Sequence, residues 1–199
     1  MIDFDRLKLY KQYLNTIQPY LDKYFEDQKE YLSCQKGCSH CCRNGSYPYS
    51  NLEFEYLKIG LLKMDLKEQK GVIRRIQKLK ADYQKVENKE KYMYECPFIN
   101  EEGICTVYEY RGIICRVFGL LKTCDDGEIV IPFCQNLGLN YSKVYNKESR
   151  KIDNDLVKKF GYKNTPKAYD LSFKTLMRED MFENAKVDFG EIKSLVEWL

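Results

Sequence analysis

Nine cysteines, arranged in two series, constrain this chain more than any other feature of its sequence. The first series is a C-x3-C-x2-C-C box, and the second is spread more widely along the chain. Their members are Cys34, Cys38, Cys41 and Cys42, followed by Cys96, Cys105, Cys115, Cys124 and Cys134. Thiols at this density are cross-linked, bound to metal or reactive, and the compartment decides which of these applies.

The N-terminal sequence indicates a reducing compartment. MIDFDRLK has neither the basic start nor the apolar run of a secretory signal, and no apolar stretch reaches membrane-spanning length. We therefore expect a cytoplasmic protein with no membrane partner. A disulfide framework does not persist in the cytosol, and an odd number of cysteines cannot all pair within one chain. Metal ligation is the leading interpretation.

Composition indicates an ordinary globular protein. The 199 residues are 44% hydrophobic, which is enough for one core, so we expect a single domain spanning 1–199. The net charge of +3, from 33 basic and 30 acidic residues, does not predict an obligate nucleic-acid partner. We interpret the basic excess within 63–91 as a solvated helix face. No feature identifies a protein partner.

Apolar residues recur at helical spacing in several segments. We expect helices over 3–32, with a kink or break at Pro19, over about 51–64, and from Val72 to near Asn88. Capping signals at Thr165-Pro166 and at Asp188 with Glu191 predict two more, and 140–155 reads as loop or irregular helix. Turn residues predict hairpins at 98–107 and 120–131. The predicted fold class is mainly α, a single domain of amphipathic helices with two small β-hairpins around a cysteine-rich metal site.

The cysteine spacing favours a metal site. Thiolates are soft donors that suit zinc, copper(I) and iron–sulfur clusters, and a C-x2-C step lets two sulfurs converge through a turn. We expect the neighbouring side chains of Cys41 and Cys42 to diverge, so that they serve different metals or different irons of a cluster, or so that one is a ligand and the other only a neighbour. That expectation argues for a two-metal or polynuclear site on which both cysteine series converge.

The order of these motifs resembles the YkgJ-type cysteine-cluster proteins, a family of zinc- or iron-chelating domains. The matching elements are the first box, Cys96-Pro97, Cys105-Thr106-Val107-Tyr108, Arg111, Cys115-Arg116-Val117-Phe118, and Cys134 before Gly138-Leu139. The resemblance covers a core of 34–139, with helical flanks at 1–33 and 140–199. It implies eight ligands: Cys34, Cys38, Cys41, Cys42, Cys96, Cys105, Cys115 and Cys134.

Two positions depart from that family pattern. Gly112 stands where the family usually has proline, and Cys124 matches no family position. We expect Cys124 to lie beside the Asp126-Gly127 turn, apart from the convergent thiols. Flagellin lysine N-methylases look distantly related in the same box.

Three further residues are candidates for the site. Arg111 and Arg116 could offset the charge of clustered thiolates or bind an anionic cofactor, and a structural salt bridge is an equal alternative for each. His40, the one histidine, could complete a zinc site. We expect it not to be a ligand, because the matching cysteines already supply enough donors.

Three functions remain open from the sequence. The leading hypothesis is a cytosolic metal-binding protein that chelates zinc or iron, with an iron–sulfur cluster as one form that the iron could take. The alternative is an iron–sulfur-dependent protein-modifying enzyme such as a lysine N-methyltransferase, although no glycine-rich nucleotide turn is present. The third is a thiol redox sensor at Cys38 and Cys41. The enzyme question stays open.

Overall fold

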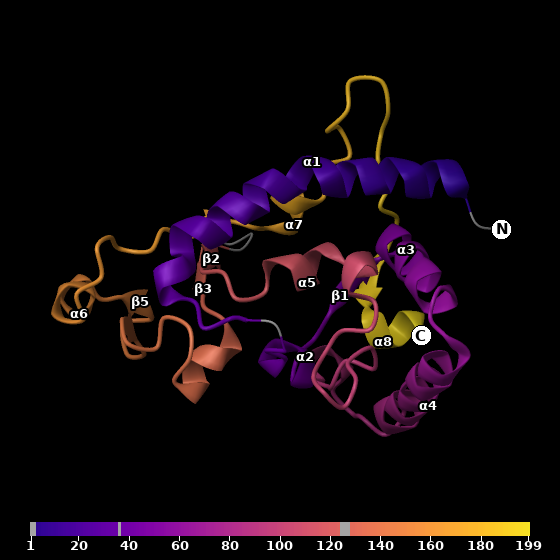
Figure 1. Ribbon diagram of the computed structural model, residues 1–199, viewed down its shortest axis with the longest axis horizontal. Helices are drawn as coiled ribbons and strands as arrows, with labels where there is room; N and C mark the ends of the chain where they lie inside the picture. Colours follow the sequence, from indigo (N-terminus) through magenta and orange to yellow (C-terminus); the bar gives the residue numbers. More distant parts are fainter. Residues whose placement is uncertain (1–2, 36, 124–127) are drawn as a thin grey trace. The chain divides into compact units, whose positions relative to one another are not determined.

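The structure is a computed structural model that describes residues 3–35, 37–123 and 128–199 (Figure 1). The fold is mainly α, with short strands, as the sequence predicts. The chain divides into two compact units. The first contains Met1–Leu14, Lys36–Arg116 and Glu179–Leu199, and the second contains Asn15–Gln35 and Val117–Arg178. Each unit is described separately below.

The first unit is built from helices and one two-stranded sheet (Figure 1). Its helical elements are the start of α1 (Phe4–Gln28), α2 (His40–Arg43), α3 (Asn51–Leu62), α4 (Leu66–Tyr83), η2 (Lys89–Lys91), η3 (Tyr108–Tyr110), α5 (Ile113–Val117), which reaches the unit boundary, and α8 (Leu195–Trp198). Its strands β1 (Pro48–Ser50) and β7 (Ile192–Ser194) pair antiparallel, with Tyr49 opposite Lys193.

Aromatic rings form much of the core of this unit. Tyr10 of α1 is fully buried and packs edge-on against Tyr56 of α3, with ring centres 5.3 Å apart. Phe189 lies edge-on to both Tyr10 and Tyr13. The apolar face of α1 therefore packs into the core of this unit. Edge-to-face aromatic contacts add to the stability gained by burying apolar area. The helix continues through Pro19 as one element.

Helix α3 begins where the sequence predicts. The Ser50 hydroxyl accepts a hydrogen bond from the Glu53 amide at 3.2 Å, and the Glu53 carboxylate accepts one from the Ser50 amide at 2.7 Å. This reciprocal pair is a capping box, which satisfies two amide donors that the first helical turn leaves unpaired. Helix α4 begins earlier than expected, at Leu66, because Asp65 caps it.

The C-terminal segment differs from the prediction. Instead of a helix after Asp188, the chain forms β7, and the capping box shifts to Ser194 and Glu197 at the start of α8. Asp188 caps the Gly190 amide in a tight turn, and Gly190 has a φ of +69°. A tertiary contact, the pairing with β1, overrides the local helix signal here.

The second unit has a small core beneath short strands. Its elements are the end of α1, η1 (Lys29–Tyr31), β2 (Lys122–Thr123), β3 (Ile129–Val130), η4 (Phe133–Leu137), β4 (Tyr145–Asn146), β5 (Lys151–Ile152), α6 (Asn154–Lys159), β6 (Tyr169–Asp170) and α7 (Phe173–Leu176). The strand order β3-β2-β6 is antiparallel and then parallel. The buried side chain of Gln28 in α1 donates a hydrogen bond to the Leu121 carbonyl and accepts one from the Leu121 amide. These two contacts fix the chain where it enters this sheet.

The predicted second hairpin is confirmed in its strands, because β2 and β3 pair antiparallel. Its Asp126-Gly127 turn and Cys124 lie outside the described residues. Two other expectations are wrong. A β4–β5 hairpin occupies part of the segment predicted as loop, held by Asn146, whose side chain caps the amides of Glu148 and Ser149.

The helix expected after Thr165-Pro166 does not begin there. Tyr169 and Asp170 pair with β2, and the short helix α7 starts later, behind Ser172 as its N-cap. Strand pairing with a distant segment again overrides a local capping signal. Within the described residues, no helix is both long and apolar enough to cross a membrane.

The capping box of α3 gives a stability prediction. Ser50→Ala removes the hydroxyl that accepts from the Glu53 amide, so the free energy of unfolding should fall by about 1 kcal/mol. Urea unfolding followed by Trp198 fluorescence measures this, since Trp198 stacks on Phe54 of α3. Ser46→Ala, at an exposed position, is the control and should leave the midpoint unchanged. Equal midpoints for both variants would contradict the prediction.

Candidate metal centre

Backbone pairing brings the first cysteine box beside the second series. Gly45 and Tyr94 form an antiparallel bridge, with amide-to-carbonyl distances of 3.2 and 3.0 Å. One step further, the Cys96 amide donates to the Cys42 carbonyl at 2.7 Å. Cysteines that are far apart in the sequence are therefore adjacent in this unit. This pairing follows from no local signal, because it joins two segments separated by α3 and α4.

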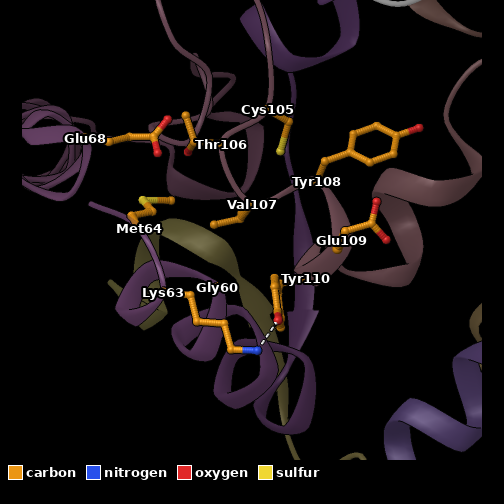
Figure 2. A pocket seen from close by; sticks show the side chains of 10 residues that line it. All are labelled: Gly60, Lys63, Met64, Glu68, Cys105, Thr106, Val107, Tyr108, Glu109 and Tyr110. Atoms are coloured by element: carbon orange, nitrogen blue, oxygen red, sulfur yellow. Dashed lines mark hydrogen bonds between the residues drawn. The ribbon is translucent and has the colours of Figure 1, made fainter. Parts of the chain in front are cut away.

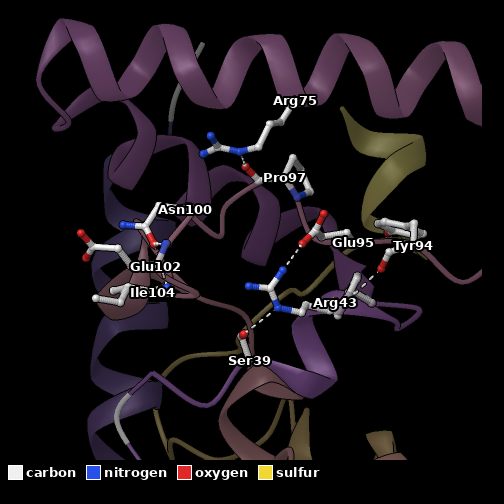
Figure 3. A network of polar contacts seen from close by, with 10 residues as sticks. Ser39, Arg43, Arg75, Tyr94, Glu95, Pro97, Asn100, Glu102 and Ile104 are labelled. Carbon is white, nitrogen blue, oxygen red and sulfur yellow. Dashed lines mark hydrogen bonds and ion pairs between the residues drawn. The ribbon is translucent and has the colours of Figure 1, made fainter.

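Two arginines brace the pairing from outside (Figure 3). Arg43 donates to the Ser39 hydroxyl at 3.1 Å and to the Glu95 carboxylate at 2.9 Å, so it spans the two paired segments. Arg75 reaches from α4 to the Pro97 carbonyl at 2.7 Å. The fixed N–H donors of a guanidinium suit this kind of bridging. Together these contacts hold the Cys96-Pro97 segment in place.

The predicted first hairpin is a tight turn with a single bridge, between Ile99 and Cys105. The Asn100 side chain accepts from the Glu102 and Ile104 amides. Gly103 has a φ of +77°, a backbone conformation that side chains other than glycine rarely adopt. The turn therefore returns the chain so that Cys105 lies opposite Ile99, shortly after Cys96.

Helix α5 carries Cys115, and a buried carboxylate fixes its start. Glu53 Oε1 accepts from the Ile113 amide at 2.7 Å, while Glu53 also caps α3. Burial raises the pKa of Glu53, and these amide hydrogen bonds oppose that rise. One side chain thus ties the first turn of α3 to the first turn of α5. The position of Cys115 depends on this link.

Tyr49 of β1 makes direct contact with Cys115. Its hydroxyl oxygen lies 3.4 Å from Cys115 Sγ, and the Gly112 amide donates to the same hydroxyl at 2.8 Å. Burial, and then the nearby Cys115, raise the pKa of Tyr49 well above its ordinary value. The hydroxyl therefore keeps its proton. Proline at residue 112 would have no N–H to donate to this hydroxyl.

Thiols of the second series act on one another, and Cys42 of the first box lies with two of them near Tyr47. Burial is the main cause that raises the pKa values of Cys96, Cys105 and Cys115, the last to about 12. Cys115 and Cys105 raise the pKa of Cys96 further, and Cys105 raises that of Cys115. The hydroxyl of Tyr47 lies near Cys96, Cys42 and Cys115, whose charges also raise its pKa. In this unit the first box and the second series therefore share one buried environment.

Cys41 and Cys42 do not diverge as expected. Their thiols hydrogen-bond to each other, and this contact is the largest cause that raises the pKa of Cys41, ahead of burial. A cysteine side chain turns about a single χ1 angle, and a change of rotamer can bring neighbouring sulfurs together. Divergence of these two side chains is therefore no reason to assign Cys41 and Cys42 to different metals.

Arg111 and Arg116 have different surroundings. The Arg111 guanidinium lowers the pKa values of Cys105 and Cys115, and its carbon lies 3.6 Å from the centre of the Tyr108 ring. Its Nε is buried and has no hydrogen-bond partner. Arg116 donates to the backbone carbonyls of Arg111 and Glu109. Arg111 is thus the arginine that faces the thiols.

A pocket of about 290 Å³ opens beside Cys105 (Figure 2). Lys63, whose ammonium donates to the Tyr110 hydroxyl at 2.7 Å, lies on one side of it. The acidic side chains of Glu68 and Glu109 also line the pocket. Cys105 contributes a thiol to its wall, so this part of the thiol cluster is reachable from outside the unit.

Two of the expected ligands belong to the second unit. The Asn140 side chain donates to Cys34 Sγ at 3.2 Å and to the Gly119 carbonyl. Cys34 and Cys134 both lie close enough to Tyr141 to raise its pKa, to which burial contributes most. Cys34 is exposed, whereas Cys134 is buried. Both thiols therefore lie near Tyr141 within the second unit.

Cys38 and His40 are the remaining candidates in the first box. Cys38 is half-buried, and His40 is exposed at the start of α2. No disulfide joins any two of the eight cysteines in the described part of the chain. Among those residues, no three cysteine, histidine or acidic side chains stand in an arrangement that already holds one metal ion.

Sequence reasoning missed Tyr47, Tyr49 and Glu53 as parts of the site. The S-x-x-E spacing of Ser50 and Glu53 predicts only a helix cap, and buried tyrosines are common in cores. The available signal is the Tyr-Pro-Tyr-Ser run at 47–50, shortly after the first box, since it holds two aromatic hydroxyls close to four thiols in the sequence.

Comparison with known protein families gives one match. A model of the CxxCxxCC family, described as "Putative zinc- or iron-chelating domain", matches residues 33–135. This is just over half of the chain, and it includes all eight cysteines discussed above. No curated protein and no solved structure matches the chain.

Thiol exposure in this arrangement can be measured directly. In metal-free, folded protein, iodoacetamide should modify Cys34 many times faster than Cys96, because Cys34 is exposed while burial both covers Cys96 and raises its pKa. Mass spectrometry of timed digests gives the rate at each site. Equal rates at the two residues would contradict the described burial.

Proposed function

The chain belongs to the CxxCxxCC family of zinc- or iron-chelating domains, and we propose that it binds its metal through thiols of the first unit. The proposed donors there are Cys38, Cys41, Cys42, Cys96, Cys105 and Cys115. The observation that carries the proposal is the backbone pairing of Cys42 with Cys96, which joins the two series around Tyr47. Thiolate sets of this kind suit zinc or an iron–sulfur cluster.

The chemistry of the donor set fits such a metal. Buried thiols have raised pKa values, so they hold their protons at neutral pH until a cation displaces them. Binding requires the sulfur atoms to turn toward a common centre at about 2.3 Å for zinc. Rotation about χ1 supplies this movement without a change in the backbone.

Arg111 lies where its positive charge would offset the negative charge of the bound thiolates. Several thiolates around a divalent ion leave a net negative charge, which is costly in a buried site. Arg111 lies beside Cys105 and Cys115, and its buried Nε has a hydrogen free for an acceptor that appears only when a thiolate or bound anion is present. An unpartnered buried donor of this kind is uncommon and supports the proposal.

The pair Cys34 and Cys134 extends the proposal to the second unit. Asn140 already donates to Cys34, which is the type of contact that orients a ligating sulfur. Both residues are proposed donors, and their role is tested separately from that of the thiols in the first unit.

The proposed compartment is the cytoplasm, where thiols remain reduced.

Metal analysis of protein purified without oxygen tests the proposal. Zinc, iron and acid-labile sulfide are measured together with the visible spectrum, which distinguishes zinc alone from an iron–sulfur cluster. Cys105→Ser and Cys115→Ser should each lower the metal content, because serine is a poor replacement for a soft thiolate donor. Cys34→Ser and Cys134→Ser report on the second unit.

Cys124→Ser is the control, because Cys124 matches no element of the family pattern. Its metal content should equal that of the unmodified protein. Metal-free protein from every preparation, or equal losses from Cys124→Ser and Cys115→Ser, would contradict the proposed donor set.

Charge compensation by Arg111 makes a separate prediction. Arg111→Gln should weaken zinc binding by about 10-fold or more, the effect expected when an outer-shell partner of a metal ligand is removed. Competition with a chelator measures the dissociation constant. Arg74→Gln, at an exposed arginine of α4, is the control and should bind zinc normally. Equal affinities would show that Arg111 has only a packing role against Tyr108.

A further inference from the structure

Three groups from different parts of the first unit form a short hydrogen-bonded chain. The Gly112 amide donates to the Tyr49 hydroxyl at 2.8 Å, and the same hydroxyl lies 3.4 Å from Cys115 Sγ. Tyr49 is 2% exposed, so water does not compete for these contacts. The Tyr49 hydroxyl therefore contacts one backbone amide and one sulfur atom.

The direction of the second hydrogen bond follows from the first. The tyrosine oxygen accepts the Gly112 hydrogen, which leaves its own hydrogen free to point elsewhere. A thiolate has no hydrogen to give. Once Cys115 is a thiolate, the one hydrogen available between the two atoms belongs to Tyr49, and the tyrosine must be the donor.

The absence of a side chain at residue 112 makes this contact possible. A Cβ atom there would lie 2.7 Å from Tyr49 Cζ, 2.8 Å from Cε1 and 3.0 Å from Glu53 Oε1. Neither the buried ring nor the buried carboxylate has room to move aside at low cost. Gly112 thus supplies both the amide that binds the hydroxyl and the space that the ring occupies.

The tyrosine is also fixed from its backbone side. Tyr49 lies in β1 opposite Lys193 of β7, and its carbonyl accepts from the Trp198 indole at 2.8 Å. Groups held on paired strands keep their geometry more closely than groups on loops. The hydroxyl is therefore aimed at Cys115 before any ligand binds.

We propose that Tyr49 is a positioning residue for the metal site, which donates a hydrogen bond to the Cys115 thiolate and is held in place by Gly112. The inference rests on the proposed function, because it requires Cys115 to ligate the metal. A hydrogen bond to a metal-bound thiolate withdraws electron density from sulfur and fixes its orientation. Tyr49 therefore sets both the affinity and the electronic character of one ligand.

Cobalt(II) is a suitable probe, because thiolate-to-cobalt charge transfer gives a visible or near-ultraviolet band whose energy depends on the sulfur. In Tyr49→Phe the sulfur should donate more strongly, so the band should move to longer wavelength. Cobalt affinity should fall by about 10- to 100-fold, as found when outer-shell partners are removed. A residue with a merely structural role would not shift the band.

Tyr94→Phe is the matched control. Tyr94 is buried like Tyr49, and its hydroxyl likewise accepts a backbone amide, from Val196 at 3.1 Å, but its side-chain partner is the Ser194 hydroxyl. Both variants leave one buried amide unpaired, so both should lose a similar amount of stability to urea. Only Tyr49→Phe should alter the cobalt spectrum.

Gly112→Ala tests the same contact from the other side. Its methyl group should displace the Tyr49 ring and reproduce the band shift of Tyr49→Phe. In the double variant the two changes should not add, because both remove one hydrogen bond. If Gly112→Ala does not fold, the comparison of Tyr49→Phe with Tyr94→Phe still decides the question.

The outcomes separate this inference from the proposed function. A band shift and weaker binding in Tyr49→Phe alone support it. If the unmodified protein binds cobalt with a thiolate band and Tyr49→Phe behaves like Tyr94→Phe, the role of Tyr49 is overturned while the metal function stands. If the unmodified protein shows no thiolate band with cobalt, both are overturned.

Discussion

The buried carboxylate of Glu53 is the interaction on which the geometry of the thiol site depends. It accepts the Ser50 amide at the start of α3 and the Ile113 amide at the start of α5. A buried carboxylate is expensive unless its oxygens are satisfied, and here both are. Since α5 is only five residues long, it has little stability of its own. Its position, and with it that of Cys115, is inherited from the much longer α3.

Tyrosine is well suited to the walls of this site. Tyr47 and Tyr49 are both buried, and each uses its hydroxyl in a hydrogen bond with a backbone group. Tyr47 donates to the Cys41 carbonyl at 2.9 Å, and so supports the first box directly. The aromatic ring supplies apolar area while the hydroxyl satisfies the backbone of irregular segments. Short loops that carry thiols can be buried in this way without a regular ladder of hydrogen bonds.

The charges around the thiols favour a site whose protonation changes when a metal binds. In the absence of a cation, burial and neighbouring thiols keep Cys96, Cys105 and Cys115 protonated, and the Nε of Arg111 has no acceptor. Loss of the thiol protons to a metal would create the negative charge that Arg111 and Tyr49 are placed to meet. In the proposed metal-bound form, the cationic and hydroxyl donors would already be in place, which is a form of preorganisation.

The sequence by itself determined the mainly helical class, the capping box at Ser50 and Glu53, and membership of a metal-chelating family. Each of these rests on local spacing, such as the S-x-x-E motif or the C-x3-C-x2-C-C box, and local spacing can be read without knowing the fold. Helix signals at Thr165-Pro166 and Asp188 failed for the opposite reason, because partners far along the chain recruited those segments into strands. The tertiary structure alone decided that Cys42 lies beside Cys96, that Arg111 faces the thiols, and that Tyr49 reaches Cys115 across the space left by Gly112. The contacts of Cys42 with Cys96 and of Tyr49 with Cys115 join residues tens of positions apart, and their energy exists only when the whole unit has packed.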